Sequence, residues 1–257
     1  TTTAVNLGVS LVQQGKKVLL IDADAQANLT MALGYNRPDD IPITLSTVMQ
    51  NIIDDKTLDV SQGIIHHSEG VDLLPSNIEM SGFEVRLINA MSRERVLKTY
   101  VNEVKKNYDY VLIDCMPSLG MITINALAAA DSVIIPTQPH YLSAKGLELL
   151  LRSVSMVKRQ INPKLRIDGI LMTMVMPRTN ISKEITATVK SAYGKKIKVF
   201  DTEIPHSIRA VEATAEGKSI FAYDKSGKVA AAYEQLGKEV AEIGEKQRNQ
   251  NRADRIR

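Results

Sequence analysis

The strongest constraint on the fold is a short apolar run that ends abruptly in two carboxylates. Residues 18–21 are all apolar, and Asp22 and Asp24 follow at once. A continuous run of this kind is typical of a parallel strand that is covered on both faces. Ligands of open parallel sheets bind at the carboxyl ends of the strands. The pattern therefore predicts a buried strand whose acidic end faces a ligand.

Further strands alternate with helices along the chain. Apolar runs predict strands over residues 71–75, 109–114, 132–136, 166–174 and 198–200. Helices are expected over residues 2–14, 28–33, 44–53, 78–106, 122–130, 144–161, 182–193, 209–216 and 228–245. This alternation predicts an α/β fold with a doubly wound, mostly parallel sheet and helices on both faces. We expect one domain over residues 1–245 and a basic, polar tail over residues 246–257.

Composition narrows the choice of partners only slightly. The net charge of +3 neither requires nor excludes a polyanion, so the distribution of charge must decide. The single Cys115 excludes an internal disulfide and fits a reducing cytoplasm. No apolar stretch reaches the roughly 18 residues that predict a membrane-spanning helix. His66 and His67 are not expected to bind a metal, because adjacent residues of a strand point to opposite faces.

The start of the sequence reads as the second half of a phosphate-binding motif. Thr1-Thr2-Thr3 opens an amphipathic helix, with no strand before it. A P-loop places a strand, a Gly-rich turn and a Lys ahead of such a helix, where backbone N–H groups hold phosphate. We therefore expect the sequence to begin just after that Lys and to lack the first strand and the P-loop.

Several separated motifs resemble the ParA/Soj family of partition ATPases, which carry a deviant Walker A loop. They follow the family order over essentially the whole chain, at residues 1–8, 20–30, 114–120, 135–139 and 204–213. The resemblance implies a P-loop NTPase fold, with ATP and Mg²⁺ as cofactors. It also implies an ATP-dependent homodimer, nonspecific binding to double-stranded DNA and a ParB-like partner. Such a protein segregates plasmid, mobile-element or chromosomal DNA and is cytoplasmic and nucleoid-associated.

The resemblance also assigns roles to residues of the phosphate site. Asp24 matches the residue that orients or activates the attacking water. Thr1 matches a Mg²⁺ ligand, and Thr2 lies beside the α-phosphate. Asp114 ends the Walker B run and would hold Mg²⁺ through a water, with Asp22 as a carboxylate near the metal. The chain given is expected to be inactive, because the loop and its Lys are missing.

The switch and base-binding positions follow in the same way. Gln26 and Asn28 match switch I, and Pro117 and Gly120 match switch II. Pro205 borders the base by resemblance.

Two departures from the family pattern fall beside these positions. Ala25 stands where Pro is common, and Cys115-Met116 replaces Thr-Pro after the Walker B Asp. Cys115 is not expected to be a nucleophile, because no motif places a base near it.

Basic residues concentrate in the C-terminal half, where the DNA contacts are expected. Arg178 and Arg209 match family positions that are implicated in nonspecific DNA binding. Lysine and arginine contacts to phosphate give affinity without sequence preference. For the neighbouring lysines, a solvated surface and a DNA face are equally compatible with the pattern. No helix-turn-helix or zinc spacing indicates base-specific readout.

Three alternatives remain open at this point. A MinD-like positioning ATPase would end in an amphipathic helix that lies on lipid, but residues 245–257 contain one apolar side chain larger than Ala. A metabolic P-loop enzyme, such as a biotin-pathway ligase, would need a substrate-binding insertion. A degenerate scaffold would bind nucleotide without hydrolysing it, against which the intact Asp24 and Asp114 argue.

Overall fold

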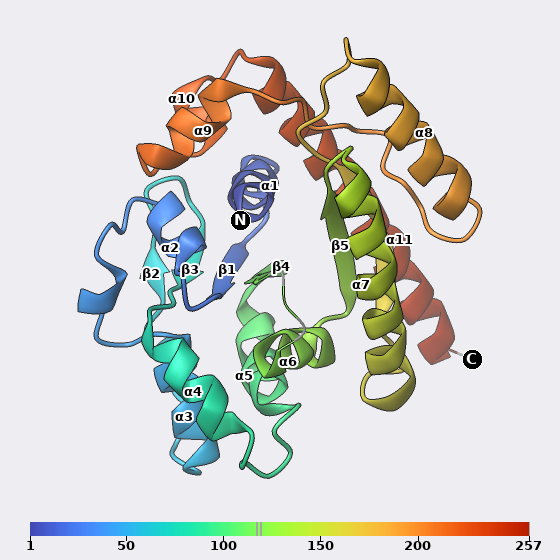
Figure 1. The fold of residues 1–257 in the computed structure, drawn as a ribbon. Coiled ribbons are helices and arrows are strands. Elements are labelled where there is room, and N and C mark those ends of the chain that lie inside the picture. Colours follow the sequence, from blue (N-terminus) through green and yellow to red (C-terminus); the bar gives the residue numbers. More distant parts are fainter. Residues whose placement is uncertain (117, 119, 257) are drawn as a thin grey trace.

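The computed structural model describes residues 1–116, 118 and 120–256, and its strands form two sheets (Figure 1). The first has four strands in the order β2-β3-β1-β4, and the second pairs β5 with β6. β1 is parallel to β3 and β4, and β5 is parallel to β6, whereas β2 and β3 are antiparallel. The strands are β1 Val18–Ala23, β2 Ile65–His66, β3 Asp72–Leu74, β4 Tyr110–Cys115, β5 Ser132–Thr137 and β6 Arg166–Met172.

Helices lie between the strands and cover both faces, as predicted. The α-helices are α1 Thr2–Gln13, α2 Asn28–Ala32, α3 Leu45–Ile53, α4 Glu79–Leu87, α5 Val96–Val104, α6 Met121–Ala129, α7 Tyr141–Gln160, α8 Asn180–Tyr193, α9 Ile208–Ala215, α10 Ile220–Tyr223 and α11 Lys228–Ile256. Two short 3₁₀ helices are η1 Pro38–Asp40 and η2 Lys105–Asn107. The expected strand at residues 198–200 is reduced to a single parallel bridge between Ile170 and Val199.

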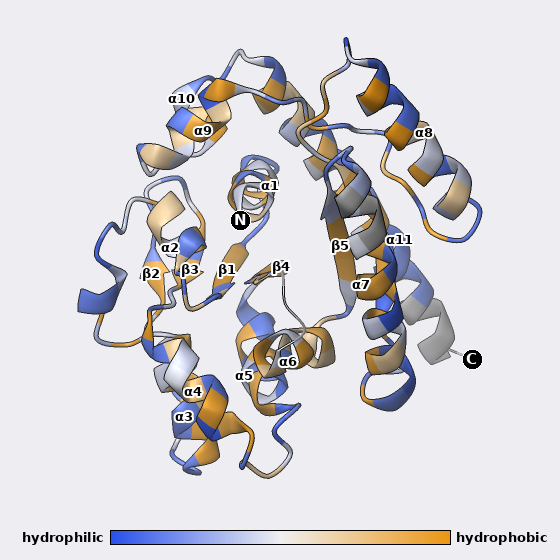
Figure 2. Cartoon of the chain, viewed as in Figure 1, coloured by the Kyte–Doolittle hydropathy of each residue, from blue (hydrophilic) through white to orange (hydrophobic). Residues whose placement is uncertain are grey.

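Two core clusters explain why residues 18–21 of β1 are all apolar. Leu20 belongs to one core cluster, which includes residues of α1 and α11. Leu19 and Ile21 belong to a second cluster, which includes residues of α3, α5 and α6. Successive residues of the strand thus enter opposite cores, and Figure 2 shows β1 in hydrophobic colours. Among the described residues, no helix is long and apolar enough to cross a membrane.

The single helix expected over residues 78–106 is wrong, because the structure contains α4 and α5 with a turn between them. Ser92 has a positive φ of 51°, which a helix does not allow. Asn125 of α6 stabilises the turn: its Nδ2 donates to the Arg93 carbonyl at 2.7 Å, and its Oδ1 accepts from Leu97 N–H at 3.1 Å. Arg93 therefore lies in a turn that Asn125 of α6 holds in place.

The last helix is longer than expected. α11 continues to Ile256, whereas the sequence analysis ended it at residue 245. Residues 246–256 contain neither Gly nor Pro, so nothing in the backbone stops the helix. Gln247 and Arg248 also reach the sheet, because Gln247 donates to Asp168 at 2.9 Å and Arg248 donates to the Asp109 carbonyl at 3.0 Å.

The first and last helices of the chain pack directly on each other. α1 and α11 share the core cluster that includes Leu7, Leu11 and Leu236. Gly237 allows the close approach, since a Cβ at this position would lie 2.2 Å from the Ser10 hydroxyl oxygen. The position of α1 thus depends on a helix more than 200 residues further along the chain.

Candidate functional site

The predicted acidic end of the sheet is present at the carboxyl ends of β1 and β4. Asp22 and Asp114 occupy matched positions of these two parallel strands. Side chains at matched positions point to the same face, and adjacent strands lie about 4.8 Å apart. The structure therefore brings together two carboxylates that are 92 positions apart in the sequence.

Thr1, which precedes α1, contacts Asp114 of this pair. The Thr1 hydroxyl donates to Asp114 Oδ2 at 2.6 Å, and the Thr1 nitrogen lies 3.0 Å from Asp114 Oδ1. Two of the three side chains predicted at the metal are thus in direct contact. A hydroxyl and a carboxylate are oxygen ligands that suit Mg²⁺.

The protein supplies few ligands of its own to such an ion. The described residues contain no group of three or more His, Cys, Asp or Glu side chains that is arranged to hold a metal. Magnesium ions that bind nucleotides usually keep several waters and take their remaining ligands from substrate phosphates. The donor set at Thr1 and Asp114 therefore fits an ion that arrives with a phosphate ligand.

Asp22 is fully buried and engaged by donors of the chain itself. Its Oδ1 accepts from Asp24 N–H at 3.2 Å, and its Oδ2 accepts from the N–H and hydroxyl of Thr30 at 2.9 and 2.7 Å. Burial raises the pKa of Asp22 to about 6, although the hydrogen bonds from Thr30 act to lower it; the nearby Asp114 carboxylate also raises it. The metal role predicted for Asp22 stays a prediction.

Asp24 keeps one carboxylate oxygen available. Its Oδ1 accepts from Gln26 N–H at 2.9 Å, and its carbonyl accepts from Ala27 N–H at 2.9 Å. Within the described part of the chain, Oδ2 accepts no hydrogen bond. A carboxylate that is held at one oxygen and open at the other suits the orientation of a water molecule.

The predicted switch residues lie around this centre. Gln26 and Asn28 are exposed, and Asn28 is the first residue of α2. Gly120 is the N-cap residue of α6, and Pro117 lies outside the described residues. Thr2, which is partly buried, accepts at its carbonyl from Asn6 Nδ2 at 2.8 Å.

The thiol beside Asp114 is not ionised at neutral pH. Burial raises the pKa of Cys115 to about 12, and the neighbouring Asp114 carboxylate adds to this effect. A nucleophilic cysteine needs a depressed pKa, so the environment disfavours that role.

A second region forms where β6 ends. Val175 N–H donates to the Ile204 carbonyl at 3.0 Å, and His206 N–H donates to the Val175 carbonyl at 3.0 Å. Val175 and Pro205 form a parallel bridge, so Pro205, which is predicted to border the base, pairs with the segment that leads to Arg178.

Both predicted DNA-contacting arginines are exposed. Arg178 lies in the loop between β6 and α8, and Arg209 lies in the first turn of α9. The Arg209 Nε is 3.7 Å from Asp224 Oδ2, and its side chain is 62% exposed. An ion pair this open contributes little to stability, so Arg209 remains available to an anionic partner.

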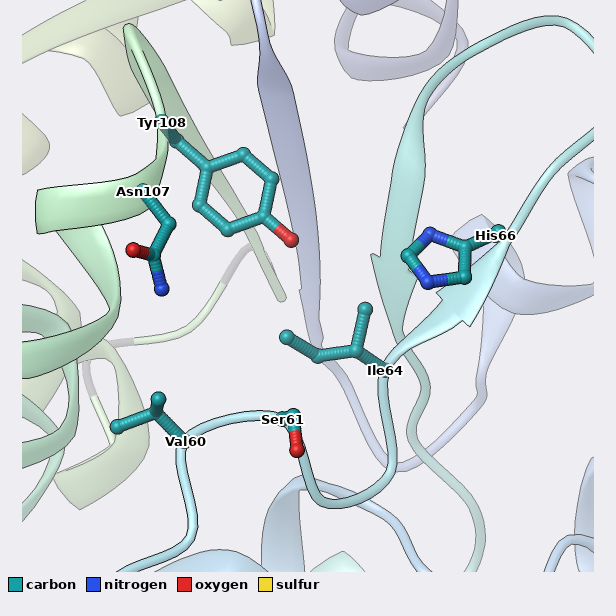
Figure 3. Close-up of a pocket in the computed structure, with 6 residues that line it drawn as sticks. All are labelled: Val60, Ser61, Ile64, His66, Asn107 and Tyr108. Atoms are coloured by element: carbon teal, nitrogen blue, oxygen red, sulfur yellow. The ribbon is translucent and has the colours of Figure 1, made fainter.

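A separate cavity lies at the opposite ends of the strands (Figure 3). It measures about 100 Å³ and is lined by Val60, Ser61, Ile64, His66, Asn107 and Tyr108. Two of its polar side chains are already paired, because Asp72 accepts from the Tyr108 hydroxyl at 2.6 Å and contacts His66 Nδ1 at 2.5 Å. This volume holds only a few water molecules, so the cavity is not the nucleotide site.

Two residues at the acidic site were missed in the sequence analysis. Thr30 contacts Asp22, and Glu84 of α4 accepts from Ile122 N–H at 3.3 Å beside the start of α6. A Cβ at Gly120 would lie 2.3 Å from Glu84 Oε1, so the end of the Glu84 side chain lies against the N-cap residue of α6. Both contacts join residues of different secondary-structure elements, so no local sequence pattern predicts them.

The comparisons with known proteins agree with this geometry. Residues 1–167 match the family model described as an AAA domain. The sporulation initiation inhibitor protein Soj of Bacillus subtilis (strain 168) is 42% identical over 245 residues, covering 95% of this chain and 94% of that protein. The chromosome partitioning protein ParA of Myxococcus xanthus (strain DK1622) is 37% identical, covering 93% and 82%. The structure of cobyrinic acid a,c-diamide synthase from Mycobacterium smegmatis with bound ATP analog and magnesium gives a TM-score of 0.80 at 32% identity, covering 92% and 86%.

Proposed function

Because this chain belongs to the ParA/Soj family and has the α/β fold of P-loop NTPases, we propose that it is a Mg²⁺-dependent ATPase that partitions DNA. The observation that carries the proposal is the contact of Thr1 with Asp114 beside Asp22 and Asp24. Phosphoryl transfer to water needs a phosphate cradle, a metal ion, a positioned water and neutralised charge. The acidic site offers candidates for the metal ligands and for the residue that positions the water.

The residues take separate roles in this proposal. Thr1 and Asp114 would hold Mg²⁺, which when bound neutralises developing charge on the phosphates. Asp24 accepts a hydrogen bond from the attacking water through its open oxygen and orients it. Thr2 lies one residue into α1, where the helix N-terminus favours an anion. Pro205 borders the base.

The proposed cycle uses ATP to join two copies of the chain. The dimer binds double-stranded DNA without sequence preference, and the exposed Arg178 and Arg209 support this part of the proposal. Hydrolysis, stimulated by a ParB-like partner, releases the DNA. The protein would thus act in the cytoplasm on the nucleoid.

We also propose that a further parallel strand and a Gly-rich loop with its Lys belong ahead of Thr1. Among the described residues, the two sheets are not hydrogen-bonded to each other, and Figure 1 shows β4 and β5 as their nearest strands. An added strand would complete one continuous sheet. Residues 1–257 alone should therefore bind ATP weakly or not at all, and tight binding in calorimetry would contradict this expectation.

DNA binding by a form with that loop restored tests the proposed function. Binding to random-sequence duplex DNA is measured with ATP, with ADP and without nucleotide, across a salt series. We expect binding that requires ATP, weakens with salt and is weaker in Arg209→Ala. If the protein binds no DNA with ATP, with ADP or without nucleotide, the partition mechanism is wrong. Binding to anionic vesicles would then favour the MinD-like alternative.

A further inference from the structure

The hydroxyl of Thr30 joins three segments of the chain close to Asp24. It donates to Asp22 Oδ2 at 2.7 Å and accepts from Ser76 N–H at 3.2 Å. Thr30 is fully buried, and its own N–H donates to the same Asp22 oxygen at 2.9 Å. One side chain therefore ties the end of β1 to α2 and to the segment that follows β3.

Asp22 transmits this restraint to Asp24. A buried carboxylate keeps its orientation only while its hydrogen-bond donors are in place. With Oδ2 held by Thr30, Oδ1 is directed at the Asp24 N–H, 3.2 Å away. The backbone of Asp24 is thus fixed by a side chain that Thr30 orients.

We propose that Thr30 is a positioning residue for Asp24 and acts through the Asp22 carboxylate. The inference rests on the proposed role of Asp24 in ATP hydrolysis. A displacement of about 1 Å at a reacting group can lower a rate by about 100-fold. Loss of the Thr30 hydroxyl should therefore reduce kcat, whereas ATP binding, which uses other groups, should change little.

Three substitutions test the role in hydrolysis. Thr30→Val keeps the side-chain volume and removes the hydroxyl, and Thr30→Ser restores a hydroxyl. Thr186→Val is the matched control, because Thr186 is also buried but its Oγ1 has no hydrogen-bond partner in the described part of the chain. In the form with the Gly-rich loop restored, we expect Thr30→Val to lower kcat by at least about tenfold with KM for ATP within about threefold. Thr30→Ser should recover most of the rate, and Thr186→Val should match the unchanged protein.

Hydrogen exchange of residues 1–257 gives a readout that does not depend on hydrolysis. Thr30→Val should speed exchange of the Asp24, Gln26 and Ala27 amides, and Thr30→Ser should not. Faster exchange throughout the chain would indicate general destabilisation and would contradict the positioning role.

The two measurements separate the two hypotheses. Unchanged kcat and unchanged exchange in Thr30→Val overturn the inference, as does an equal loss in Thr30→Val and Thr30→Ser. If the unchanged protein hydrolyses no ATP but Thr30→Val still exposes these amides, the proposed function is wrong while Thr30 still positions Asp24.

Discussion

The two sheets end in opposite kinds of surface. At the ends of β1 and β4, Asp22 and Asp24 are buried and bonded within the chain, and Asp114 is largely buried against Thr1. Beyond β6, Arg178 and Arg209 are exposed and nearly unrestrained. The proposed hydrolysis at the acidic end would depend on exact geometry, whereas the proposed DNA binding at the basic end would depend on charge that remains accessible.

The largest expected effect comes from a substitution at the acidic end that leaves the basic end unchanged. Asp24→Ala should lower kcat for ATP hydrolysis by about 10³-fold, because it removes the group that orients the water. Phosphate release measures the rate. ATP-dependent DNA binding should persist, since the arginines are untouched. Parallel loss of DNA binding would show that the two ends are not separable.

The next effect lies at the contact between the two regions. Gly34 ends α2 and Gly217 ends α9, and a Cβ at Gly217 would lie 2.3 Å from Gly34 Cα. Gly217→Ala adds this clash to the strain of a φ of +65°, so it should lower the free energy of unfolding by about 3 kcal/mol. Gly15→Ala is the control, because Gly15 has φ +76° but nothing within 4 Å of its added Cβ. It should cost about 1 kcal/mol in denaturant unfolding. Equal losses of unfolding free energy in Gly217→Ala and Gly15→Ala would mean that the ends of α2 and α9 can separate without cost.

A smaller effect concerns how the basic region is anchored. Glu239 of α11 accepts from Thr202 N–H at 3.0 Å and lies 3.3 Å from Lys198 Nζ. Burial acts to raise the pKa of Glu239, but these hydrogen bonds and the Lys198 charge outweigh it and lower the pKa. A lowered pKa stabilises the fold above the ordinary glutamate pKa, and the contribution is lost as the pH falls.

Glu239→Gln should therefore cost about 1.5 kcal/mol at pH 7 and progressively less on acidification. Thermal unfolding across pH 3–7 measures the difference. Glu234→Gln, on the same helix but in an exposed pair with Lys238, should change little. A loss at Glu239 that does not depend on pH would contradict the electrostatic explanation.

The smallest effect tests the basic end by charge alone. Arg178→Ala should weaken DNA binding by about fivefold and reduce the salt slope by about 1, with hydrolysis unchanged. Arg37→Ala removes the same charge from an exposed side chain that pairs with Asp40. If Arg37→Ala weakens DNA binding as much, net charge rather than the predicted face determines affinity.

The sequence predicted five of the six strands among the described residues, because their apolar runs can be read locally. It missed the two-residue β2, and the strand expected at residues 198–200 is a single bridge. The family resemblance assigned Thr1 and Asp114 to the metal site; the structure shows their side chains in contact, and the metal role stays a prediction. The break between α4 and α5 was not predictable, because its turn is stabilised by Asn125 from a separate helix. The role of Thr30 was hidden for the same reason. The DNA-binding roles of Arg178 and Arg209, which the family resemblance assigned, stay predictions.

The packing of α1 on α11 has a consequence for how the protein is made. A ribosome produces α11 more than 200 residues after α1, so α1 lacks one of its covering surfaces over that interval. The apolar face of α1 must then remain exposed or be shielded by a chaperone. The contact that positions Thr1 through α1 therefore forms only after translation has passed residue 228, and a truncation within α11 should yield an aggregating chain.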